Sequence, residues 1–184
     1  MAVRGLFEYA RRALFSAPSP EQQLLRATKR HEVRRVVELG VDSLDGSHSL
    51  LATLVKRAGE EPVRYVGFDA FDERSAETEP LSLIDAHRRL SGGGARVRLT
   101  PGGPVAGVAA EANALADTDL LILSSLATDA ALASVWFFLP RMCHAATLVL
   151  RRDASAADDE AAYRVVPVSE LVARSGLDAT RRAA

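Results

Sequence analysis

The sequence predicts an α/β fold in which a doubly wound, mostly parallel sheet is covered by helices on both faces. Short apolar segments alternate with stretches of helical periodicity along most of the chain, which is typical of β-α-β units. Two of those segments, 35–40 and 64–69, each close with a glycine or an acid. A third contains Leu120-Leu121-Ile122-Leu123, as expected of a central parallel strand that is buried on both sides.

The composition is that of a soluble globular protein with one domain. The chain has 184 residues, of which 48% are hydrophobic and 26% are charged, and its net charge is -1. This balance gives no reason to expect a nucleic acid or an anionic membrane as partner. No apolar run reaches the roughly 20 residues that span a bilayer, and the start lacks a signal peptide's features. We therefore expect a cytoplasmic protein. Cys143, the single cysteine, is expected to be a buried structural thiol.

Two helices are expected ahead of the sheet, in a basic N-terminal arm over 1–32. Apolar residues recur at helical spacing over 3–15, and a second helical stretch starts near Pro20 and runs towards Arg30. The arm either closes over a ligand as a lid or packs plainly against the sheet edge. The sequence leaves both alternatives open.

The main domain is expected over 33–176, followed by a disordered tail at 177–184. Apolar or alternating segments bounded by turn residues predict strands at 35–39, 64–69, 95–100, 119–124, 146–151 and 163–168. Helical periodicity predicts helices at 47–58, 81–90, 105–115 and 129–142, and a last short helix from 169. Pro140 is expected to kink or end the fourth of these helices.

In a wound parallel sheet, ligands lie beyond the carboxyl ends of the strands, where the strand order switches direction. We expect strand 35–39 at that point. The residues near the ligand are then those at 38–43, 69–72, 100–103 and 124–126. Gly40 would allow a sharp turn beside the ligand, and Asp69 would accept hydrogen bonds from both hydroxyls of a ribose.

The loop after the first strand indicates the charge of the ligand. The dinucleotide fingerprint G-x-G-x-x-G and the phosphate loop G-x-x-x-x-G-K-[ST] are both absent. Asp42 and Asp45 would repel a pyrophosphate. A cationic or zwitterionic ligand fits better, and S-adenosylmethionine carries an ammonium and a sulfonium beside its ribose and adenine.

Two segments carry a resemblance to a known family. Val36-Val37-Glu38-Leu39-Gly40-Val41 and Tyr65-Val66-Gly67-Phe68-Asp69-Ala70-Phe71 resemble the first two motifs of class I S-adenosylmethionine-dependent methyltransferases. They are most similar to those of the macrocin O-methyltransferase type. The order of elements agrees with that family from about residue 33 to residue 152.

The resemblance implies a Rossmann-like fold, S-adenosylmethionine as cofactor, and methyl transfer. Glu38 and Gly40 would lie beside the methionine part, and Asp69 would hold the ribose. Phe71 would border the adenine or the pocket mouth, Gly102 and Gly103 would pass near the adenine, and Ser124 and Ser125 would face the transferred methyl. The candidate cofactor-binding residues are Glu38, Gly40, Val41, Asp42, Asp69, Ala70, Phe71, Gly102 and Ser124.

The chain departs from the family at the expected metal ligands. The related enzymes carry aspartates after the fourth strand and paired acids after the fifth, where this chain has Leu123-Ser124-Ser125-Leu126 and Arg151-Arg152-Asp153. Divalent cations prefer several carboxylate oxygens, so no metal site is predicted. The loop 42–47 is expected to be longer than the family's turn. The usual C-terminal end, a helix and an antiparallel strand pair, is reduced here to one clear strand.

Two functions from different classes follow. The first is a metal-independent methyltransferase that acts on an unknown small molecule. The second is a catalytically inactive relative that binds a ligand or a protein partner. Whether the chain forms a homodimer is left open by the sequence. An unrelated nucleotide-binding module is a weaker third idea. No catalytic residue is assigned, because the histidines His31, His48, His87 and His144 stand at positions that suit ordinary surface or packing roles.

Overall fold

The computed structural model describes residues 18–152 and 163–176. The helix expected at 3–15 and the expected tail at 177–184 lie outside the described residues.

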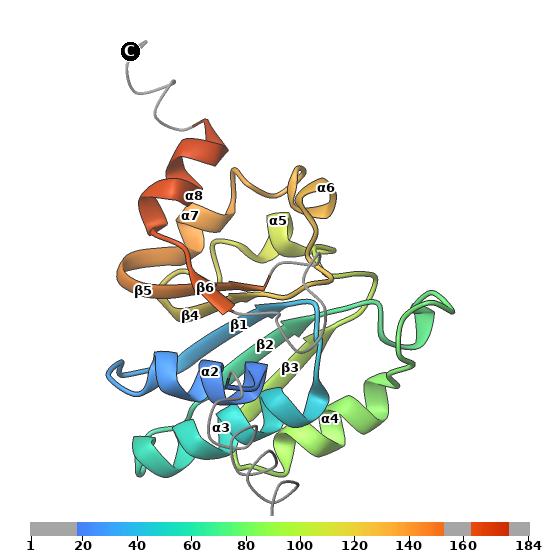
Figure 1. Ribbon diagram of the computed structural model, residues 1–184, viewed down its shortest axis with the longest axis vertical. Helices are drawn as coiled ribbons and strands as arrows, with labels where there is room; N and C mark the ends of the chain where they lie inside the picture. Colours follow the sequence, from blue (N-terminus) through green and yellow to red (C-terminus); the bar gives the residue numbers. More distant parts are fainter. Residues whose placement is uncertain (1–17, 153–162, 177–184) are drawn as a thin grey trace, which may run out of the picture.

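Six strands form one open sheet in the order β3-β2-β1-β4-β5-β6 (Figure 1). The first five are parallel to one another, and β6 runs antiparallel to β5. The bounds are β1 (Arg35–Leu39), β2 (Arg64–Phe68), β3 (Arg96–Thr100), β4 (Thr118–Leu123), β5 (Cys143–Arg152) and β6 (Tyr163–Val165). The order reverses between β1 and β4, as the sequence predicted.

Helices cover both faces of this sheet (Figure 1). One face carries α2 (Pro20–Thr28), α3 (Leu44–Ala58) and α4 (Leu83–Ser91), and the other carries α5 (Val108–Glu111), α6 (Asp129–Leu132), α7 (Leu139–Met142) and α8 (Val168–Ser175). A single 3-10 turn, η1 (Phe71–Glu73), follows β2. The predicted α/β class with a mostly parallel, Rossmann-like sheet is therefore confirmed.

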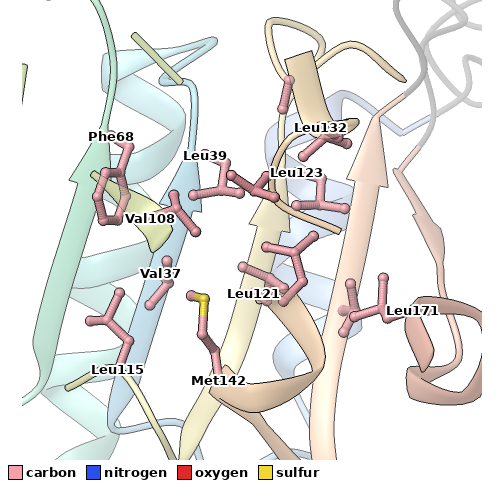
Figure 2. Packing of buried hydrophobic residues seen from close by; sticks show 14 of the residues in the cluster. Val37, Leu39, Phe68, Val108, Leu115, Leu121, Leu123, Leu132, Met142 and Leu171 are labelled. Atoms are coloured by element: carbon pink, nitrogen blue, oxygen red, sulfur yellow. The ribbon is translucent and has the colours of Figure 1, made fainter. Parts of the chain in front are cut away.

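Successive side chains along the strands point to opposite faces of the sheet and contribute to two hydrophobic cores. In β4, Leu121 and Leu123 face α5 to α8, whereas Leu120 and Ile122 face α2 to α4, and all four are fully buried. Figure 2 shows the first core, where Leu121 and Leu123 meet side chains from β1, β2 and the covering helices. Each fully buried Leu or Ile side chain stabilises the fold by about 1.5–3 kcal/mol. The run of four apolar residues in β4 is thus explained by a core on each side.

The start of α3 corrects one expectation. This helix begins at Leu44 instead of 47, because the Ser43 hydroxyl accepts the Gly46 N–H at 3.1 Å and caps it. Most of the segment expected as a long loop is therefore helical, and the prediction of a longer turn after β1 was wrong.

The helices after β3 and β4 are shorter than predicted. The expected helix over 105–115 is reduced to α5, and the expected helix over 129–142 is split into α6 and α7. Between them, bonds of the i to i+3 type, such as Val135 N–H to the Leu132 carbonyl at 2.9 Å, are mixed with i to i+4 bonds, so no regular α-helix continues. Gly107, at φ 80°, delays the start of α5. Short helices depend on packing rather than propensity, so periodicity overestimated them.

The second expected helix of the arm, α2, packs on the sheet layer. Leu24 is buried in the core beneath α3, and the Gln23 side-chain oxygen accepts the Tyr163 N–H of β6 at 2.8 Å. The packing alternative therefore describes this helix. Across the described ranges, no helix has both the length and the apolar character needed to cross a membrane.

Candidate functional site

The carboxyl ends of β1 and β2 meet at the point where strand order reverses. The two strands are paired in parallel, with Leu39 opposite Phe68, so the residues that follow them lie at the same edge. β4 flanks β1 on its other side, with Leu123 opposite Leu39. Loops from three strands therefore converge here, which is the usual place for a ligand in an open α/β sheet.

Glu38 is a buried carboxylate on the side of β1 that faces α3. Its oxygens accept hydrogen bonds from the Ser47 hydroxyl at 2.8 and 3.1 Å and from the Tyr65 hydroxyl at 2.7 Å. Burial raises the pKa of Glu38 to about 7, although the Tyr65 and Ser47 hydroxyls lower it. The nearby carboxylates of Asp42 and Asp69 raise it further. Glu38 thus changes charge near neutral pH.

A hollow of about 300 Å³ lies beside Glu38. Its wall includes Ser43 and Ser47 of the α3 start, Arg152 of β5 and Tyr163 of β6. The beginning of α2, from Ser19 to Leu24, closes another side. Two carboxylates, Glu38 and Glu21, one guanidinium and several hydroxyls therefore face a single space, which suits a small zwitterionic molecule. We call this space the Glu38 hollow.

Asp69 lies just after β2 with its side chain 1% exposed, and each of its oxygens is hydrogen-bonded twice. Oδ2 accepts the Val41 N–H at 2.8 Å and an Arg74 amino group at 2.8 Å. Oδ1 accepts the Phe71 N–H at 2.8 Å and the Arg74 Nε–H at 2.7 Å. Burial alone would raise the pKa of Asp69, but these bonds outweigh it and lower the pKa. The carboxylate is charged and internally neutralised.

Arg74 is the cation that holds Asp69 in place. It also donates to the Val41 carbonyl at 2.6 Å and to the Glu79 carbonyl at 2.8 Å. Its guanidinium therefore ties the loop after β1 to the loop after β2. It bonds both oxygens of the carboxylate that the resemblance assigns to the ribose hydroxyls.

Phe71 lies inward instead of bordering an open pocket. Its side chain is 1% exposed and packs with Val41 and Ala86 in a small third core. Its φ of 47° is unusual for a residue with a side chain. The N–H bond to Asp69 and the buried ring together hold this conformation. Ala70 precedes it as the residue that opens η1.

Asp42 connects the loop after β1 to the loop after β4. It accepts the Ser125 hydroxyl at 2.6 Å and the Ser125 N–H at 2.8 Å, and Arg152 lies 3.4 Å from it. A second hollow of about 350 Å³ lies between Asp42 and Arg74, with Leu44 and Pro80 in its wall. We call it the Arg74 hollow.

Gly40 approaches another part of the protein so closely that no side chain fits. Its φ is 78°, and a Cβ atom there would lie 2.3 Å from Ser124 Oγ and 2.8 Å from Leu126 Cβ. Ser124 is buried, and its hydroxyl accepts the Leu126 N–H at 3.1 Å. The close contact at this turn is thus made by the β4 loop. The second glycine of the candidate site, Gly102, lies in the turn after β3 with a φ of 105°.

All nine predicted cofactor-binding residues thus lie around this one edge, most of them in two linked groups, with Glu38 and Gly102 outside both. Val41, Asp69 and Phe71 are joined by hydrogen bonds, with Ala70 between the latter two in sequence. Gly40 contacts Ser124, and Asp42 bonds the neighbouring Ser125. Glu38 stands apart in the Glu38 hollow, while Gly102 is linked only through the next residue, whose N–H bonds the Asp69 carbonyl at 3.1 Å.

Two of the histidines weighed as bases lie at the opposite edge. His144 begins β5 and pairs with Asp119 at 3.2 Å, and His31 lies just ahead of β1. Cys143 is partly buried instead of buried, its thiol donates to the Leu139 carbonyl, and burial raises its pKa to about 11. Within 18–152 and 163–176, no group of three His, Cys, Asp or Glu side chains could hold a metal ion.

Sequence reasoning missed the two arginines that balance the site. Arg74 pairs with Asp69, and Arg152 faces Asp42. Arg74 was detectable, since it is the one cation in the acidic stretch from Asp69 to Glu79. Ser47 and Tyr65 were missed because their contact with Glu38 needs the register of β2 against β1. The negative charges of Asp69 and Asp42 are therefore largely neutralised by arginines of the protein itself.

Comparison with protein-family models and with curated protein sequences found no match.

Proposed function

We propose that this chain is a methyltransferase-like protein that binds S-adenosylmethionine, or a compound with the same adenosyl chemistry, at the carboxyl edge of β1 and β2. The observation that carries the proposal is the placement of Glu38 and Asp69. These buried carboxylates lie at the carboxyl ends of two adjacent central strands. The Glu38 hollow lies beside Glu38, and the Arg74 hollow lies beside Arg74, the partner of Asp69. Such an edge is where open α/β sheets bind nucleoside ligands.

The Glu38 hollow would receive the amino-acid end of the ligand. An ammonium beside Glu38 would favour the charged form of that carboxylate, and Arg152 would attract the ligand's carboxylate. The Arg74 hollow would receive the adenosine end. The ribose would then compete with Arg74 for the oxygens of Asp69, because all of their bonds are already made.

Methyl transfer would proceed by in-line displacement, and the protein's contribution would be to position donor and acceptor without a metal. Glu38 has a pKa suited to a general base at neutral pH, but its oxygens already accept from Ser47 and Tyr65. We therefore assign it to ligand binding and leave the acceptor unidentified.

The test is calorimetry with S-adenosylmethionine and S-adenosylhomocysteine on the wild type and on Arg74→Ala. Removing the competing guanidinium should tighten binding by roughly tenfold or more, because a hydrogen bond to a charged group contributes about 1.5–3 kcal/mol. Arg89→Ala is the matched control, since Arg89 is exposed and pairs with Asp45 at 3.0 Å on the nearby α3 start. Absence of binding to either compound by all three proteins would refute the proposal.

A second candidate, a binding protein without catalysis, is favoured by one observation. Arg74 bonds both oxygens of Asp69, which the ribose hydroxyls would need. It also ties the loop after β1 to the loop after β2, and a bound cofactor would have to separate these loops. Formation of S-adenosylhomocysteine from labelled donor, with a broad panel of small acceptors, separates the two. Binding of both adenosyl compounds with no turnover on any acceptor supports the second candidate.

A further inference from the structure

The amino edge of the sheet, opposite to the candidate site, carries a groove of about 440 Å³ whose rim is arginine. Arg35, Arg64 and Arg96 are the first residues of β1, β2 and β3, and they are paired across the strands in register. Residues in register point to the same face of a sheet. One step further along, on that same face, lie Val37, Val66 and Arg98. The groove therefore has a cationic rim and a partly apolar floor.

The groove exists because α5 is short. Residues 114–116, which follow α5, form one wall, and the Ala116 carbonyl accepts a bond from Arg35 at the start of β1. On this face of the sheet, no helix of the described chain extends over the beginning of β2 and β3 (Figure 1). A full helix over 105–115, as the sequence predicted, would be long enough to cover more of this face. The turns that replace it leave the four arginines exposed.

Internal carboxylates balance only half of this charge. Arg98 pairs with Glu111 of α5, and Arg35 lies 3.5 Å from Asp117. The side chains of Arg64 and Arg96 make no hydrogen bond or ion pair with any residue of 18–152 or 163–176. Two unneutralised guanidinium groups thus face one concave space.

Three arginines in register across neighbouring strands repel one another unless an anion binds them. Neighbouring strands lie about 4.8 Å apart, and like charges directly opposite one another destabilise a sheet. The chain keeps three arginines in consecutive register at this cost. Arginine's planar fork of donors matches the oxygens of a phosphate group in a two-pronged fashion.

From these observations we propose that the amino-edge groove binds a small ligand carrying two or more phosphate groups. Arg64 and Arg96 would hold the phosphates, and Arg35 would assist from the third strand. Val37 and Val66 would contact the less polar part of the ligand. The net charge of -1 and the limited size of the groove favour a compact molecule over a nucleic-acid strand. This site is separate from the Glu38 and Arg74 hollows, so the inference does not depend on the proposed function.

The experiment is calorimetric titration of the full chain with inorganic triphosphate at low salt. The double variant Arg64→Ala/Arg96→Ala should lose roughly tenfold to a hundredfold in affinity, and added salt should weaken binding by the wild type. Arg88→Ala/Arg89→Ala is the matched control. It removes the same charge from exposed positions on α4, and its affinity should match that of the wild type. A parallel titration with a nucleoside triphosphate distinguishes a nucleotide ligand from a free polyphosphate.

Thermal unfolding without ligand separates binding from a structural role. Because the row of arginines repels itself, the Arg64→Ala/Arg96→Ala variant should unfold at the same temperature as the wild type or higher. The proposal is overturned if triphosphate does not bind, if both double variants lose affinity equally, or if lost affinity comes with a lower unfolding temperature. It is also overturned if a single-stranded oligonucleotide binds the wild type more tightly than triphosphate does, since the groove would then be a nucleic-acid surface.

Discussion

Glu38 and Asp69 show how two carboxylates at one sheet edge come to have opposite titration behaviour. Asp69 receives four hydrogen bonds, two of them from a guanidinium, and its pKa is lowered. Glu38 receives its bonds from neutral hydroxyls only, and burial raises its pKa to about 7. The difference is set by Arg74 and by the backbone N–H groups of Val41 and Phe71, which Glu38 lacks, because burial by itself disfavours both charges.

The raised pKa of Glu38 predicts a specific dependence of stability on pH. An unfolded glutamate loses its proton near pH 4.5, whereas the folded one keeps it until about 7. Between these values only the folded state binds the proton, so this group stabilises the fold at pH 4.5 and the contribution is lost as pH rises to 7. The loss is on the order of 3 kcal/mol for a shift of this size. Glu38→Gln removes it, since an amide does not titrate.

We therefore expect the stability of Glu38→Gln, relative to the wild type, to increase as the pH is raised from 5 to 8. Urea denaturation at several pH values measures this difference, which cancels the titration of all other groups. Glu60→Gln changes an exposed glutamate and serves as control, with a difference that stays flat. A flat difference for Glu38→Gln as well would mean that Glu38 titrates alike in both states.

At the scale of elements, the turn from β1 into α3 is fixed by its contact with the end of β4. Gly40 bonds the Phe68 carbonyl through its N–H at 2.7 Å, while the space beside its Cα is filled by Ser124 and Leu126. This turn therefore joins the ends of three strands. A glycine is needed both for the positive φ and for the close approach.

Gly40→Ala should destabilise the protein through two separable effects. The left-handed backbone costs an alanine about 1–2 kcal/mol, and the collision with Ser124 and Leu126 adds roughly 1–3 kcal/mol of overpacking. Gly176→Ala isolates the first effect, because Gly176 has a φ of 71° and nothing lies within 4 Å of a Cβ atom there. Thermal and urea unfolding of both variants should show the larger loss at Gly40. Equal losses would show that the β4 loop yields without cost.

Sequence patterns predicted the bounds of the first four strands well. For the site, they predicted where its residues lie but not which side chains pair there. The bounds of β1 match the prediction, and β2, β3 and β4 match within one residue at each end, because apolar runs between turn residues leave little choice. The pairing of Arg74 with Asp69 was beyond those patterns. It depends on η1 turning the chain back by a single 3-10 turn, which the buried ring of Phe71 and its positive φ set. The shortening of α5 likewise reflects local turn geometry. Because the sequence predicted a longer helix, it gave no sign of the arginine groove.

At the scale of the whole molecule, α2 connects the N-terminal part of the described chain to β6 in its C-terminal part. It packs on α3 through Leu24, and Gln23 bonds the N–H of Tyr163 in β6, 140 residues away. β6 in turn pairs with β5 at the sheet edge. A helix with such bonds belongs to the cooperative unit, although its first residues also line the Glu38 hollow.

Leu24→Ala tests whether α2 unfolds with the rest of the protein. Truncating a buried leucine costs about 2–5 kcal/mol, whereas Leu25, which is only partly buried, should cost clearly less and is the control. The single tryptophan, Trp136, packs against the core on the opposite face of the sheet, so its fluorescence reports a distant layer. If α2 is part of one cooperative unit, Leu24→Ala lowers the urea midpoint seen by Trp136 as much as the midpoint seen by circular dichroism. An unchanged Trp136 midpoint would mean that α2 opens on its own, as a lid over the Glu38 hollow would.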